Sequence, residues 1–180
     1  AWVEVWIDGE WYFLGACEPE PVLNLGWFNE PASRAMLIHA RVFGKYAGKD
    51  EINAENKQFT NINVTPRYAK TNKQFIKVEK NGKAVKNATV EFQLYNYAEF
   101  FTIASKTTGA NGTTFLTTGY GDLLIWAYNE QDFGFKKISA GVHDTIIIEL
   151  NGNKSEKIFL EFMPPEATEH VVVNVSEKQT

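Results

Sequence analysis

The sequence predicts a mainly β protein, in which an α+β segment that is incomplete by itself precedes a small antiparallel β-sandwich. Two observations carry this prediction. Residues 1–48 hold four of the five tryptophans, and so short a stretch cannot bury them alone. Beyond residue 72, short strands with period-2 alternation follow one another between turns rich in Gly and Asn, and little helical periodicity is present.

A change of character near residue 48 sets the expected domain boundaries. Residues 1–48 form the aromatic first segment. Residues 49–72 are polar and rich in Asn and Lys, which suits a linker or a crossing strand. Residues 73–150 contain the strands of the sandwich, and residues 151–180 are expected to be C-terminal strands or a tail. Because the first segment cannot bury its aromatic residues, we expect that a further part of the same parent chain precedes it.

The first segment opens with a predicted β-hairpin. Trp2, Glu4 and Trp6 alternate with aliphatic residues, and a second apolar run covers residues 11–14. The Asp8-Gly9 pair between the two runs is a signal for a tight hairpin turn. A loop with prolines follows, and residues 31–37 are expected to be a short helix or an extended segment.

The sandwich strands are predicted from alternation and from turn residues. Residues 90–95 alternate apolar and polar side chains, as a half-buried strand does. Turns are expected at Asn81-Gly82, Asn111-Gly112 and Asn151-Gly152. The other expected strands are 75–78, 123–128, 145–150, 158–162 and 171–175.

Composition narrows the function classes. The chain has 180 residues and a formal net charge of −4, which argues against nucleic acid as the main partner. The basic run of residues 67–86 is either a binding patch or the solvated face of a strand pair. No apolar run approaches the roughly 18 residues of a membrane span, and the start lacks the pattern of a signal peptide. We therefore expect no membrane span.

Single residues give few chemical signals. His39, His143 and His170 lack metal-ligand spacing, so no metal and no cofactor are expected. Cys17 is the only cysteine, which excludes an internal disulfide, and it is expected to be a small buried apolar residue. Two readings of the aromatic residues Trp2 and Trp27 stay open. They belong to the core or a domain interface, or they bind a ligand as a sugar platform.

The first 48 residues resemble the back part of the transglutaminase-like cysteine hydrolase core, in particular the peptide N-glycanase type. The likeness rests on Trp2-x-Glu4-Val5, then on Cys17-Glu18, then on Gly26-Trp27. It implies a Cys-His-Asp mechanism, in which a thiolate attacks an amide carbonyl and an acid orients the histidine. The family's cysteine lies upstream, and its histidine would stand immediately before Ala1.

The resemblance also identifies the position at which this chain lacks the family's catalytic acid. Gly15 stands where the family carries its carboxylate, so Glu18 is the first candidate to orient the histidine and Glu20 is the second. Otherwise Glu18 caps the loop, or this branch of the family has lost catalysis. Because the nucleophile and the base are both outside the chain, we expect the chain by itself to be inactive.

Residues 73–150 resemble the carboxypeptidase regulatory-like, transthyretin-like β-sandwich. The likeness rests on small turn residues placed before successive strands, namely Gly82, Ala88, Gly112, Gly119 and Gly121. Modules of this kind brace or dock neighbouring domains.

Two function classes follow, and whether the parent is an enzyme stays open between them. In the first, the chain is the C-terminal part of a transglutaminase-like amide hydrolase or transamidase that acts on a protein or glycopeptide. In the second, it is a non-catalytic binding or structural module of a secreted multi-domain protein. Both readings place the protein in an extracellular or periplasmic compartment.

Overall fold

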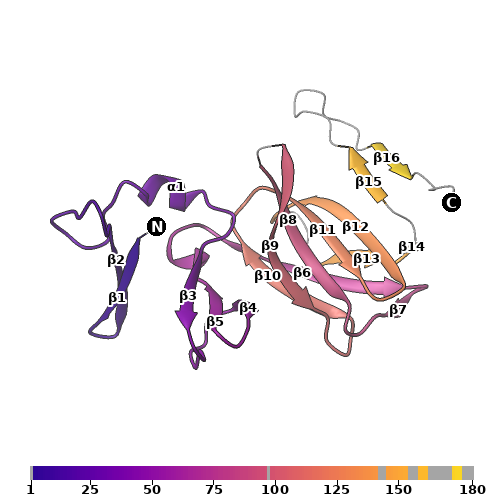
Figure 1. The fold of residues 1–180 in the computed structure, drawn as a ribbon, viewed down its shortest axis with the longest axis horizontal. Helices are drawn as coiled ribbons and strands as arrows, with labels where there is room; N and C mark the ends of the chain where they lie inside the picture. Colours follow the sequence, from indigo (N-terminus) through magenta and orange to yellow (C-terminus); the bar gives the residue numbers. More distant parts are fainter. Residues whose placement is uncertain (1, 97, 142–144, 154–157, 162–171, 176–180) are drawn as a thin grey trace.

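The computed structural model describes residues 2–96, 98–141, 145–153, 158–161 and 172–175. It is mainly β, as predicted, and it divides into an N-terminal part with a lone hairpin and a later part with two facing sheets (Figure 1). A small sheet between them links the two parts.

The predicted hairpin is confirmed. Strands β1 (Val3–Ile7) and β2 (Glu10–Leu14) pair antiparallel, with Val3 opposite Leu14 and Trp6 opposite Trp11. Asp8 and Gly9 have φ values of 49° and 90°, and positive φ at both central positions matches the right-handed twist of the strands. The register places alternate residues of both strands on the same face of the hairpin.

The segment after the hairpin contains a short helix, α1 (Asn29–Ser33), and a three-stranded antiparallel sheet. This sheet has the order β3 (His39–Phe43), β5 (Phe59–Asn63), β4 (Ile52–Glu55) and leads into a 3-10 helix, η1 (Thr65–Arg67). Residues 49–72, expected to be a linker or a crossing strand, therefore hold two strands and a helical turn. Because β3 pairs with β5, the sheet continues across residue 48.

The β-sandwich is confirmed over residues 72–153. One sheet has the order β10-β6-β13, with β7 attached to β6, and the other has the order β14-β12-β11-β8-β9. All strand pairs in the two sheets are antiparallel except β6 with β13, which is parallel. The strands are β6 (Asn72–Lys80), β7 (Lys83–Ala84), β8 (Thr89–Asn96), β9 (Glu99–Thr107), β10 (Thr113–Thr118), β11 (Asp122–Tyr128), β12 (Asp132–Ser139), β13 (Ile146–Glu149) and β14 (Gly152–Asn153).

The two last expected strands also form. β15 (Ile158–Glu161) and β16 (Val172–Val175) pair antiparallel with each other, and the remainder of the expected C-terminal region lies largely outside the described residues.

The main core lies between the two sheets of the sandwich. In β8, Val90 and Phe92 are fully buried while Glu91 and Gln93 are partly exposed, which is the alternation that the sequence predicts. Each buried aliphatic or aromatic side chain contributes about 1.5–3 kcal/mol relative to exposure. The sheets contribute the following core residues: Ile76, Val78, Leu116, Ile146 and Ile148 from one, and Val90, Phe92, Leu123, Ile125 and Ile138 from the other.

Polar contacts fix the small sheet to the sandwich. The Asn63 side-chain amide donates to the Thr117 carbonyl oxygen at 2.7 Å, and the Thr117 N–H donates to the Glu51 carboxylate at 3.1 Å. Lys106 pairs with Glu51 at 3.2 Å. Because β5 leads directly into η1, these contacts also hold η1 in place relative to the sandwich.

Two Asn-Gly turns allow a matched test of the fold. Gly82 and Gly112 have φ values of +72° and +74°, where an alanine costs roughly 1–2 kcal/mol. A Cβ on Gly112 would also lie 2.7 Å from the Val78 carbonyl oxygen, whereas a Cβ on Gly82 meets nothing within 4 Å. Urea unfolding should show that Gly112→Ala lowers the free energy of unfolding by at least about 1 kcal/mol more than Gly82→Ala. Equal losses would contradict the packing of this turn.

Candidate functional site

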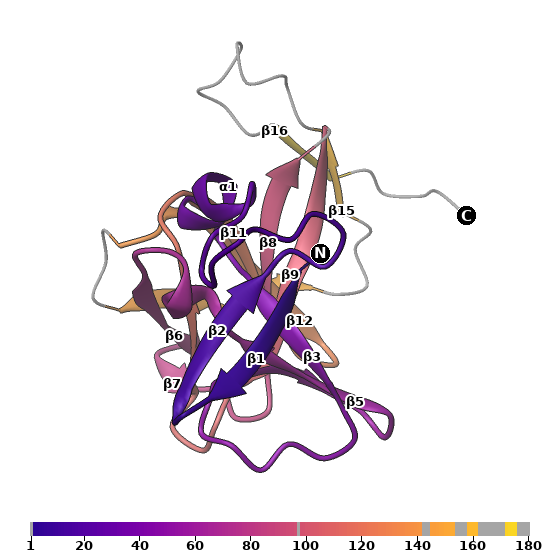
Figure 2. The same ribbon diagram turned by 90° about the vertical axis from the view of Figure 1, so that its left-hand side faces the viewer.

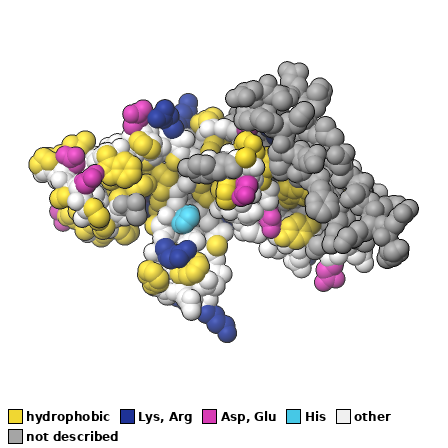
Figure 3. Space-filling model, turned by 45° about the horizontal axis from the view of Figure 1, so that its top comes forward, with side chains coloured by type: hydrophobic (Ala, Val, Ile, Leu, Met, Phe, Trp, Pro, Cys, Tyr) yellow, Lys and Arg dark blue, Asp and Glu magenta, His cyan; other side chains and the backbone are white. Residues whose placement is uncertain are grey.

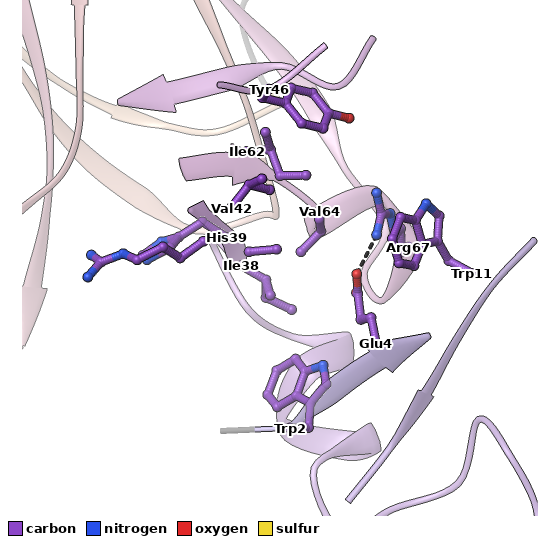
Figure 4. Close-up of a pocket in the computed structure, with 12 residues that line it drawn as sticks. Trp2, Glu4, Trp11, Ile38, His39, Val42, Tyr46, Ile62, Val64 and Arg67 are labelled. Carbon is purple, nitrogen blue, oxygen red and sulfur yellow. Dashed lines mark hydrogen bonds and ion pairs between the residues drawn. The ribbon is translucent and has the colours of Figure 1, made fainter. Parts of the chain in front are cut away.

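A pocket of about 530 Å³ lies between the hairpin and the small sheet. Figure 4 shows Trp2, Glu4 and Trp11 on the hairpin side and aliphatic residues of β3 and β5 on the other. Tyr46 and Arg67 complete the wall. The aliphatic and backbone lining comes from Ile38, Ala40, Val42, Ile62 and Val64, and His39 and Arg41 add polar groups.

An aromatic cluster attaches the hairpin beside this pocket. Trp2 stacks on Phe28 with ring centroids 4.4 Å apart and an angle of 5° between the planes. Phe13 packs on Phe28 at 5.3 Å and on Tyr68 at 5.1 Å. Offset and edge contacts of this kind add about 0.5–1.5 kcal/mol per pair to the burial of the rings. Phe28, which precedes α1, is the buried centre of the cluster.

A chain of hydrogen bonds and ion pairs follows the aromatic cluster. The Trp2 indole Nε1–H donates to the Tyr68 hydroxyl at 2.8 Å, and that hydroxyl donates to the Glu4 carboxylate. Glu4 also pairs with Arg67, as the dashed line in Figure 4 marks. Arg67 in turn pairs with Asp50 at 3.2 Å.

Two aromatic side chains contact the Asp50–Arg67 end of this network. The Tyr46 hydroxyl donates to the Asp50 carboxylate. The Arg67 guanidinium lies over the Trp11 ring, 5.0 Å from its centroid, which is within the range of a cation–π contact. Residues far apart in the sequence, from the hairpin and from residues 46–68, thus share one continuous polar network.

The electrostatics of this network favour a positioning role. Burial, followed by the hydrogen bond to Glu4, raises the pKa of Tyr68 far above its ordinary value. The hydrogen bond to Asp50, followed by burial, raises the pKa of Tyr46. Both hydroxyls therefore stay protonated at neutral pH and act as hydrogen-bond donors. The network can orient the hairpin and bind a ligand in the pocket, but its tyrosines are unsuited to take up or release a proton there.

The residues that the sequence singles out are dispersed. Trp2 lines the pocket and is part of the aromatic cluster, whereas Trp27 is exposed and touches Phe28 edge-on at 5.8 Å. Glu18 and Glu20 are exposed in the loop after β2 and do not line the pocket. The structure brings Trp2 into the site and leaves the other three outside it.

Cys17 corrects one expectation. It is exposed, not buried, because β2 ends at Leu14 and the chain turns away from the strand at Gly15. The turn is tight enough that a Cβ on Gly15 would collide with the Glu18 carbonyl oxygen. A carboxylate side chain therefore has no space at Gly15 in this loop.

Glu4, Asp50, Arg67 and Tyr68 were not identified from the sequence as site residues. One signal was available, since Glu4 occupies the same strand face as Trp2 and Trp6. A carboxylate among aromatic residues on one face needs a partner when it is buried. The identity of that partner depends on residues more than 60 positions away, which local patterns do not specify.

Two findings concern other kinds of site. Within the described residues, no group of three or more His, Cys, Asp or Glu side chains is arranged to hold a metal ion. No helix in the same part of the chain has the length and apolar character needed to cross a bilayer.

The hydroxyl of Tyr68 offers a direct test of the network. Tyr68→Phe leaves the Trp2 N–H and one Glu4 oxygen without this partner, and should lower the free energy of unfolding by about 1–2 kcal/mol. Tyr12→Phe is the matched control, because its hydroxyl makes an exposed 3.3 Å contact with Glu10, and it should change stability by less than about 0.5 kcal/mol. Chemical denaturation measures both. Equal losses would mean that the network does not hold the hairpin.

Comparison with protein-family models gives no match to this chain, and comparison with curated protein sequences gives none either.

Proposed function

We propose that the chain is the C-terminal, closing part of a transglutaminase-like thiol amide hydrolase or transamidase that acts on a protein or glycopeptide. In this proposal the cysteine and histidine come from an upstream part of the parent chain, and the chain alone does not turn over substrate. The β-sandwich braces the catalytic core. One observation carries the proposal, namely that the hairpin β1–β2 is apolar on both faces and that the described residues cover it only in part.

The two faces of the hairpin differ in what covers them. The inner face carries Trp2 and Phe13, which pack on Phe28 and Tyr68. On the outer face, Val3 and Ile7 are exposed, whereas Val5, Tyr12 and Leu14 are half-buried. The inner face is also open near the turn, where Trp6 is 55% exposed and Trp11 is 46% exposed. Figure 2 shows the hairpin in front of the rest of the described chain, with no described element lying over it. Val3 is 45% exposed and Ile7 is 40% exposed.

An uncovered apolar face supports a role as part of a larger sheet. Strands that are apolar on both faces are typical of sheets covered on both sides. A lone two-stranded hairpin is marginally stable in water. Among the described residues, β2 has one further β-bridge, which joins Leu14 to Leu25. Completion by further strands or a helix from the parent would bury the outer face.

The hairpin register supports Glu18 as the acid that orients the histidine. Val3 lies opposite Leu14, the last residue of β2, so the chain before Val3 and the chain after Leu14 leave the hairpin at the same end. The residue just before Ala1 would therefore lie at the end of the hairpin from which the loop with Glu18 departs. Because the loop leaves no space for a side chain at Gly15, a carboxylate must come from a neighbouring position. Glu18 is the nearest, and Glu20 is the second candidate.

The same glycine favours a second candidate function. A family member without the carboxylate at position 15 can serve as a non-catalytic binding or structural module of a secreted multi-domain protein, outside the cytoplasm. The exposed indole of Trp27 would then act as an aromatic contact for a sugar or a protein.

Substitutions in the complete parent protein separate these functions. Glu18→Gln should lower kcat by about 10⁴, the loss seen when an orienting acid becomes its amide in the serine-protease template. Cys17→Ser is the matched control in the same loop and should keep the parent's turnover, because Cys17 is not the nucleophile. Hydrolysis of peptide amides and glycopeptides measures both, with folding checked by circular dichroism, and the isolated chain should show no turnover.

Three outcomes would contradict the proposal. If the isolated chain hydrolyses these substrates and Cys17→Ser abolishes the activity, the nucleophile is in this chain. If Glu18→Gln keeps the parent's kcat, Glu18 has no part in the mechanism. A parent sequence without a cysteine upstream and a histidine just before Ala1 would leave the module function as the explanation.

A further inference from the structure

The charged side chains of the N-terminal segment are all acidic. Residues 1–33 contain six acidic residues and no Lys or Arg. Glu4 is paired with Arg67, and Glu30 is paired with Arg34 at 3.1 Å. The other four acids are exposed, and no Lys or Arg of the described residues forms an ion pair with them. These are Asp8, Glu10, Glu18 and Glu20.

These unpaired acids accompany an uncovered apolar surface. Glu10 lies opposite Ile7 in the hairpin, so it is on the same outer face. In the loop that carries Glu18 and Glu20, Val22 is 57% exposed and Leu23 is 42% exposed. Figure 3 shows the result, since the left-hand end of the molecule displays hydrophobic and acidic side chains without Lys or Arg among them. We call the outer face of the hairpin together with Val22 and Leu23 the docking face.

We propose that the docking face binds a basic amphipathic segment, whose apolar side covers the hairpin and whose Lys and Arg side chains pair with the surrounding carboxylates. This inference rests on the proposed function, because it takes the docking face to be covered by another segment. It adds the chemical character of that segment. Burial of exposed aliphatic side chains supplies most of the affinity, while the charges select the partner.

The negative charge of the docking face also argues against other binding partners. A second copy of the chain would bring the same four acids against this face, and like charges across an interface are unfavourable. An anionic membrane surface and nucleic acid are excluded for the same reason. A neutral apolar segment would leave the carboxylates without partners at the rim of the contact.

A pair of model peptides tests the charge preference. The first probe is an amphipathic helical peptide of leucine and lysine about 14 residues long, and the second replaces every lysine with glutamate. Isothermal titration calorimetry with the 180-residue chain should show binding of the leucine–lysine peptide and none of the acidic one. The affinity should fall as salt is raised from about 0.05 to 0.5 M, because screening weakens the charge pairs.

Matched variants locate the binding. The triple variant Glu10→Gln, Glu18→Gln, Glu20→Gln should weaken binding of the leucine–lysine peptide about tenfold. The control triple variant Glu55→Gln, Glu99→Gln, Glu130→Gln also removes three negative charges, at exposed positions outside the docking face, and should change the affinity less than about twofold. Equal weakening by both triples would show attraction to net charge alone and overturn the proposal.

A second pair of variants tests the apolar contact. Val22→Ser with Leu23→Ser should weaken binding about tenfold or more. Phe43→Ser is the control, because Phe43 is 82% exposed on β3 and lies outside the docking face. These loop and surface changes leave the sandwich core intact, which circular dichroism verifies.

The proposal is overturned if neither peptide binds, if the acidic peptide binds as well as the basic one, or if the Val22 and Leu23 changes have no effect. Its failure is distinct from that of the proposed function. Hydrolysis by the parent can depend on Glu18 even if the covering segment is not basic, and a basic partner can bind even if the parent is not an enzyme.

Discussion

The ion pair between Glu4 and Arg67 is the interaction on which the position of the N-terminal hairpin depends. The Glu4 side chain is 13% exposed and that of Arg67 is 21% exposed, so both charges have lost most of their water. A charge in such surroundings is costly unless it is paired and hydrogen-bonded. Tyr68 and Asp50 supply the additional hydrogen bonds and charge, and Trp11 lies under the guanidinium. Any displacement of the hairpin would leave several of these groups without partners.

This constraint explains the unequal faces of the hairpin. Because Glu4 points to Arg67, Trp2 and Phe13 on the same face are brought onto Phe28 and Tyr68. The opposite face then points outward, with Val3 and Ile7 exposed to water. Orientation by a buried charge therefore produces both the pocket on the inner side and the docking face on the outer side.

The sequence was sufficient to predict the features that depend on neighbouring residues. The Asp8-Gly9 turn, the alternation in β8 and the turns at Asn81-Gly82 and Asn111-Gly112 each express a local conformational preference, and each strand signal falls on an observed strand. The turn expected at Asn151-Gly152 is wrong, because Gly152 begins strand β14, which pairs with β12. Two features depend on pairing between strands that are far apart in the sequence, and composition does not indicate such pairing. They are the parallel pairing of β6 with β13 and the sheet that continues across residue 48. For the same reason the partners of Glu4 were not found from the sequence. The expectation that Cys17 is buried is wrong, because β2 ends at Leu14 and the chain turns away before Cys17.

A double-mutant cycle between Glu4→Ala and Arg67→Ala tests the central claim most directly. Native-state hydrogen exchange of the backbone N–H groups in β1 and β2 reports the free energy of opening of the hairpin in the wild type, both single variants and the double variant. The account predicts that the two changes are coupled by at least about 1 kcal/mol, because each single change leaves the other, largely buried charge without its partner in the Glu4–Arg67 ion pair. Effects that add to within about 0.3–0.5 kcal/mol would contradict it, since they would mean that the ion pair does not hold the hairpin in place.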